Sequence, residues 1–141
     1  IPTIMDYRNH IKEGSMLNTP PVFAVYVCML TLQWLKAQGG VAAIEIINNE
    51  KAAMLYKAID DSPLFTGTVS PGDRSNMNVC FVMKDPSQEE PFLQFVKQHG
   101  IVGIKGHRLV GGFRASLYNA LPISSVEVLI QLIRDFTLQK A

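Results

Sequence analysis

The stretch FRASLYNALPISSVEVLIQLIRDF, residues 113–136, passes from a strand pattern directly into a helix pattern, and this change of period decides the fold. Over 113–118 apolar and polar side chains alternate, as they do in a strand with one buried face. The apolar positions are Phe113, Ala115 and Leu117. Arg114 falls on the opposite face, so we expect it to point away from the core.

The second half of the stretch predicts a helix with a defined start. Ser124 and Glu127 have the spacing of a capping box, and Ile123 and Val128 can form a hydrophobic staple around it. The helix is therefore expected to begin just after Ser124. Its predicted core side chains are Val128, Leu129, Leu132, Ile133 and Phe136.

Working toward the N-terminus, the pattern predicts further strands over 64–69, 77–83 and 101–104. A helix is expected over about 87–99, with Phe92, Phe95, Val96 and His99 on its buried side. Two helices come earlier, separated by Gly39-Gly40. The core positions expected in the first are Phe23, Val27, Leu30 and Trp34, and in the second Ile44, Ile47, Leu55 and Ile59.

This order of elements predicts an α+β fold, a small, mostly antiparallel sheet covered by helices. Residues 1–17 read as an extended lead-in, and residues 18–141 as one domain. The chain starts Ile1-Pro2 without an initiator methionine, so we expect a piece of a longer protein.

Composition narrows the function classes. With 48% hydrophobic and 18% charged residues in 141, the chain is expected to be globular. Its net charge of +1 argues against a broad basic face for nucleic acid. No apolar run approaches the roughly 18 residues that a membrane helix needs. Cys28 and Cys80 are too few for a disulfide framework or a metal site, so we expect two buried thiols and a cytoplasmic location.

The segment GHRLVGGFRASLYN, residues 106–119, carries the best candidate site. Arg108 and Arg114 offer planar forks of donors that match carboxylate or phosphate, and His107 adds a further donor. The pair Gly111-Gly112 supplies a turn without side chains. These residues predict a local anion site, although arginines near a turn are also common on ordinary surfaces.

Other polar residues carry weaker signals. Asn18 and Thr19 stand before a predicted helix, where they serve as simple caps or help to hold a phosphate. A structural role is preferred for His99 and a surface role for Lys105. Arg74 is either a loop anchor or part of an interface. No catalytic triad, nucleotide-type glycine loop or metal-ligand spacing is present.

Three stretches closely resemble the phosphoserine aminotransferase family: SMLNTPP (15–21), RSNMNV (74–79) and KGHRLVGGFRASLYNALP (105–122). The resemblance spans essentially the whole chain. It implies the C-terminal small domain of a pyridoxal-phosphate enzyme of fold type I, with 1–17 leading in from a missing large domain. Such enzymes move an amino group between glutamate and 3-phosphohydroxypyruvate, giving 2-oxoglutarate and O-phosphoserine in serine biosynthesis.

The resemblance also implies roles for individual residues. Arg114 would bind the substrate carboxylate, and His107 and Arg108 the substrate phosphate. Asn18 and Thr19 would reach the pyridoxal phosphate of the other subunit in a homodimer. Because the cofactor-bearing lysine belongs to the large domain, no catalytic residue is expected here, and the piece alone should be inactive.

A different class of function also fits the residues alone. A stand-alone regulatory module could recognise small phosphorylated or carboxylated metabolites through the same three cationic side chains. Binding of nucleic acid by the basic loop is a more distant alternative, since no aromatic stacking platform is evident.

Overall fold

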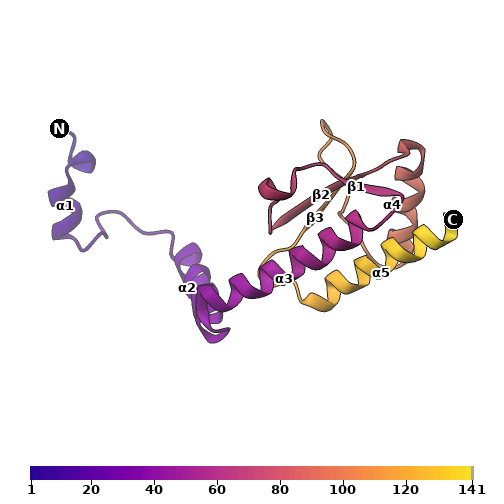
Figure 1. Cartoon of the computed structure of the whole chain (residues 1–141). Coiled ribbons are helices and arrows are strands. Elements are labelled where there is room, and N and C mark those ends of the chain that lie inside the picture. The colour runs from indigo at the N-terminus through magenta and orange to yellow at the C-terminus, as the bar shows by residue number, and fades with distance from the viewer. Residues whose placement is uncertain (141) are drawn as a thin grey trace. The chain divides into compact units, whose positions relative to one another are not determined.

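The computed structural model describes residues 1–140. The chain divides into two compact units, the first Ile1–Val41 and the second beginning at Ala42. Figure 1 gives the order of the elements along the chain. No helix among the described residues is long and apolar enough to cross a membrane.

The first unit contains a 3-10 turn at Thr3–Met5 and helices α1 (Tyr7–Lys12) and α2 (Val22–Ala37). The expectation that residues 1–17 are extended is therefore wrong, because both the 3-10 turn and α1 lie within them. Asp6 caps α1, because its side chain accepts a hydrogen bond from the backbone N–H of Arg8. After α2, Gly39 and Gly40 both take positive φ angles, 95° and 80°, as expected of the residues that end a helix.

The predicted buried stripe of α2 is wrong as far as this unit is concerned. None of the 16 residues of α2 is buried, and Phe23 is 80% exposed. Apolar side chains also occur outside the stripe, for example at Val25 and Leu32. A helix that is apolar on several sides needs cover on several sides, and no element of residues 1–41 supplies it.

The second unit is built on a three-stranded antiparallel sheet in the order β1-β2-β3. The strands are β1 (Phe65–Gly67), β2 (Asn78–Met83) and β3 (Phe113–Ser116). Register is set by pairs such as Phe81↔Phe113 and Cys80↔Arg114. The predicted α+β class and the antiparallel sheet are confirmed.

Helices α3 (Gly40–Asp60), α4 (Glu89–Gln98) and α5 (Ile123–Lys140) contribute to one core with the sheet (Figure 1). Its centre is aromatic: the rings of Phe92 and Phe113 lie 5.1 Å apart, and those of Phe92 and Phe136 5.2 Å apart. The alternation expected for β3 is confirmed, since Phe113, Ala115 and Leu117 are all buried. Arg114 is exposed, on the opposite face.

The strand predicted over 101–104 does not form. Only an isolated bridge, Lys105↔Phe113, joins this segment to β3. Gly103 has a φ of 79°, which turns the backbone away from an extended course. The sheet therefore has one strand fewer than expected.

The start of α5 also differs from the prediction. The helix begins at Ile123, so Ser124 lies inside its first turn instead of capping it. The backbone N–H of Ser125 already bonds to the carbonyl of Pro122, at 3.1 Å. Val128 is 48% exposed rather than buried, while the unpredicted Val126 and Ile130 are in the core.

Three smaller expectations need correction. His99 is exposed, not on the buried side of α4, although its Nδ1 does bond to the carbonyl of Phe95 at 2.8 Å. Cys28 is exposed and Cys80 is half-buried, so neither thiol is the buried apolar residue expected.

Candidate functional site

The loop between Gly106 and Gly112 is closed by its own backbone. Gly106 N–H donates to the carbonyl of Gly112 at 2.7 Å, at the base of the loop. Val110 and Gly111 both donate to the carbonyl of His107, at 2.9 and 2.8 Å. Since the next residue, Phe113, begins β3, the loop leads directly into the strand that carries Arg114.

The glycines of this loop are required by space and by backbone angle. Gly112 has a φ of 61°, and a Cβ on it would lie 2.5 Å from Cγ1 of Val82 and 2.7 Å from the carbonyl oxygen of Phe81. A Cβ on Gly106 would overlap the carbonyl oxygen of Gly111. The base of the loop therefore packs closely against β2, and this contact fixes the backbone position from which the side chains of His107 and Arg108 extend.

His107 is oriented by a hydrogen bond to its own loop. Its Nδ1 accepts from the backbone N–H of Leu109 at 3.3 Å. A neutral imidazole that accepts at Nδ1 carries its hydrogen on Nε2, which leaves a donor for a ligand. Arg108 is exposed and makes no hydrogen bond or ion pair within the described chain.

Arg114 stands on the face of the sheet opposite the core, directly across from Cys80 of β2. Its backbone N–H bonds to the carbonyl of Ile104 at 2.8 Å, but no acceptor within residues 1–140 engages its guanidinium. It lines a pocket of 430 Å³ between the 99–104 segment, β3 and the first half of α5. His107, Arg108 and Arg114 therefore belong to one continuous loop and strand with their donors free.

Asn18 and Thr19 lie in the first unit and are exposed. The interpretation of these residues as simple helix caps is wrong, because α2 begins at Val22 with Pro21 at its cap position and no side-chain cap bond. Neither side chain has a hydrogen-bond partner in the described structure. Both are available to a ligand.

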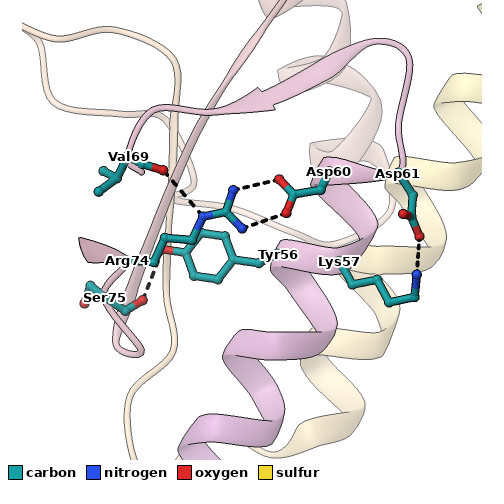
Figure 2. Close-up of polar contacts among 7 residues, drawn as sticks. All are labelled: Tyr56, Lys57, Asp60, Asp61, Val69, Arg74 and Ser75. Carbon is teal, nitrogen blue, oxygen red and sulfur yellow. Dashed lines mark hydrogen bonds and ion pairs between the residues drawn. The ribbon is translucent and has the colours of Figure 1, made fainter. Parts of the chain in front are cut away.

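Arg74 anchors its loop, so the first of its two predicted roles is confirmed. Its guanidinium donates to both carboxylate oxygens of Asp60, at 2.6 and 2.8 Å, and lies 4.5 Å from the centre of the Tyr56 ring (Figure 2). Tyr56 in turn donates to the carbonyl of Ser75 at 3.1 Å. Hydrogen bonds from Arg74 lower the pKa of the Asp60 carboxyl. The guanidinium of Arg74 is therefore already engaged and is not a free donor for an anionic ligand.

The sequence reasoning missed Lys51, which is 0% exposed. Its Nζ donates to the carbonyls of Tyr118 and Leu121, at 2.9 and 3.1 Å. A signal was present, because Lys51 falls seven residues after Ile44 and four before Leu55, on the apolar face of α3. Lys105 is exposed, as expected.

Comparison with known proteins identifies relatives along nearly the whole chain. The family model for aminotransferase class-V matches residues 2–129. The phosphoserine aminotransferase of Porphyromonas gingivalis is 56% identical over 138 residues, which are 96% of this chain and 38% of that protein. The enzyme of the same name from Flavobacterium johnsoniae is 55% identical over 134 residues, 95% of this chain and 38% of its own.

The solved structures that resemble this chain include enzymes of the same name. The phosphoserine aminotransferase from Bacillus circulans subsp. alkalophilus superposes with a TM-score of 0.89 at 39% identity, over 100% of this chain and 39% of that one. A pyridoxal-phosphate-bound phosphoserine aminotransferase from Trichomonas vaginalis gives a TM-score of 0.81 at 41% identity, over 95% of this chain and 39% of that one. The chain thus spans about two fifths of the length of the relatives that it matches.

Proposed function

The chain belongs to the class-V aminotransferase family, and from this premise we propose that it is the C-terminal small domain of a phosphoserine aminotransferase. The complete enzyme would transfer an amino group between glutamate and 3-phosphohydroxypyruvate, in serine biosynthesis in the cytoplasm. Residues 1–17 would lead in from the large domain. The relatives and structures named above are all aminotransferases, so the alternative of a stand-alone regulatory module has no support.

The observation that carries this proposal is the contrast among the arginines. Arg8 and Arg74 are held by carboxylates, at 2.7 and 2.6 Å. Arg108, Arg114 and Arg134 have no such partner in the described chain, and of these only Arg108 and Arg114 lie beside the hydrogen-bonded glycine turn. Free guanidinium groups on a rigid support are suited to bind an anionic substrate.

The two anionic groups of the substrate would be divided between strand and loop. Arg114 would hold the α-carboxylate, because a planar fork can donate to both carboxylate oxygens at once. Arg108 and Nε2–H of His107 would bind the phosphate. With its Nδ1 already accepting from Leu109, His107 can present a hydrogen to the phosphate even when it is neutral.

Asn18 and Thr19 fit a phosphate of pyridoxal phosphate as additional neutral donors. Both are exposed and free of hydrogen bonds within residues 1–140, and an amide and a hydroxyl can each donate to a phosphate oxygen. In a homodimer they would serve the cofactor of the other subunit. The cofactor supplies the electron sink for the amino-group chemistry, and no residue of this chain takes that part.

The direct test replaces Arg114 in the complete enzyme. Arg114→Ala should lower kcat/KM for both glutamate and the phosphorylated oxo acid by roughly 10- to 150-fold, because a charge-assisted contact is worth about 1.5 to 3 kcal/mol. Arg134→Ala on α5 is the matched control, an exposed arginine outside the loop and strand, and should leave kcat/KM unchanged. Unchanged kinetics for Arg114→Ala would refute the carboxylate role.

A further inference from the structure

A fully buried lysine joins α3 to the connection between β3 and α5. Lys51 donates from Nζ to the carbonyls of Tyr118 and Leu121, the two ends of a four-residue turn. Beside it, the side chain of Asn48 donates to Oδ1 of Asn119, at 2.8 Å. The turn that follows the Arg114 strand is therefore fastened to α3 at three points.

No carboxylate within the described chain offsets the charge of Lys51. Its burial removes the ammonium from water and lowers its pKa. Burying a charge without an ionic partner costs free energy of folding. Replacing such a group by an apolar residue of similar size often leaves protein stability unchanged or raises it. Core packing alone therefore does not account for a lysine here; the two carbonyls do.

The fastening lies where β3 is paired on one edge only: β2 pairs with the whole strand, from Phe113 to Ser116, while the other edge is paired only at its start. At its start, β3 is fixed by the glycine turn and by the bond from Arg114 N–H to the carbonyl of Ile104. Beyond that bond the 99–104 segment turns away at Gly103, and no backbone group of residues 1–140 pairs with Ser116 on that edge. On the β2 side, the Ser116 hydroxyl donates to Oδ1 of Asn78 at 3.1 Å and Leu117 N–H bonds to the carbonyl of Met77 at 2.8 Å. Past Leu117, the next attachments are the bonds from Lys51 to Tyr118 and Leu121.

We propose that Lys51 is a positioning residue for substrate binding: by holding the carbonyls of Tyr118 and Leu121, it fixes the end of β3 and so the direction in which Arg114 points. The inference rests on the proposed role of Arg114. In this proposal, a buried side chain on α3, far in sequence from the loop between Gly106 and Gly112, determines how Arg114 meets the substrate carboxylate.

The test uses Lys51→Met in the complete enzyme, since methionine keeps the length and removes the donors. KM for both substrates should rise about tenfold with kcat changed less than about twofold, the pattern of lost ground-state binding. Lys57→Met is the matched control, a lysine on the same helix that is 76% exposed, and should have no effect. Should Lys51→Met fail to fold, Lys51→Leu, which is also apolar and has no donor, takes its place with the same readouts.

The double variant with Arg114→Ala separates the two hypotheses. If Lys51 acts through Arg114, its substitution adds nothing further to KM in the Arg114→Ala background. Full additivity, or a normal KM for Lys51→Met alone, would overturn the positioning role while leaving the carboxylate role intact. Unchanged kcat/KM for Arg114→Ala alone would overturn both hypotheses.

Discussion

Arg114 and Cys80 stand directly opposite each other on β3 and β2, on the face of the sheet that points away from the core. A neutral side chain at position 80 leaves the guanidinium without a cross-strand partner. A carboxylate placed there would face it at the distance at which opposite charges pair across a sheet.

Cys80→Asp in the complete enzyme should therefore form an ion pair with Arg114 and raise KM for both substrates by up to about fivefold, the effect of roughly 1 kcal/mol of competing interaction. Steady-state kinetics provide the measurement. Cys80→Asn has nearly the same shape without the charge and should behave like the parent enzyme. Equal KM values for the two variants would mean that Arg114 does not bind the substrate anion.

Gly112→Ala should destabilise the second unit by about 1 to 3 kcal/mol, because alanine is strained at a φ of 61° and its Cβ would collide with Val82 and the backbone of Phe81. Denaturant unfolding of the 141-residue chain measures the change. Gly72→Ala is the control, since nothing lies within 4 Å of the added methyl group. A loss no larger than that of Gly72→Ala would contradict the tight packing of the loop base.

The ion pair of Asp60 with Arg74 should make stability depend on pH in the acid range. The folded state lowers the pKa of Asp60 from its ordinary value of 3.8, so the stabilisation is present above that pH and is lost as the pH falls through the folded-state pKa. Asp60→Asn should therefore cost about 1 kcal/mol at neutral pH, and this difference should vanish in acid.

The measurement is the free energy of unfolding of both proteins between pH 2 and pH 7. The expected cost is modest because the Asp60 side chain is 46% exposed, which weakens an ion pair through solvent screening. Asp73→Asn removes an exposed carboxylate that has no ion-pair partner in the described chain and should leave stability unaltered. A cost for Asp60→Asn that persists at pH 2 would show that packing, not charge, is responsible.

The 141-residue chain alone should neither bind pyridoxal phosphate covalently nor catalyse transamination. The resemblance assigns the cofactor-bearing lysine to the large domain, and Lys51 is buried with its donors engaged. Mixing the chain with pyridoxal phosphate and recording visible absorption and amino-group turnover checks this. Turnover by the chain alone would contradict its proposed place as one domain of the enzyme.

The sequence predicted best where burial imposes a simple rule. Phe113, Ala115 and Leu117 alternate because one face of β3 packs on the core, and Arg114 could be assigned to the other face for the same reason. The residue types of His107 and Arg108 and the glycine pair beside them predicted a local anion site, and its role in binding stays a prediction.

Prediction failed where the outcome depends on something outside the local pattern. Ile101 to Ile104 has strand-forming residues, but the positive φ of Gly103 breaks the ladder. Ser124 has the spacing of a cap, yet the first turn already starts at Pro122. The donors of Lys51 find their carbonyls 67 and 70 residues away, a distance that no local rule spans.

All buried hydrophobic residues of the described chain lie at Ile44 or later, so the stretch that carries Asn18 and Thr19 contributes nothing to the core. Substitutions in the stretch that carries Asn18 and Thr19 and substitutions in the strand that carries Arg114 should therefore have different effects on the protein. A substitution at Asn18 or Thr19 should leave yield and solubility of the protein untouched and appear only as an altered cofactor requirement. A substitution at Phe113, which is in the core, should instead reduce the amount of folded protein, whatever its effect on substrate binding.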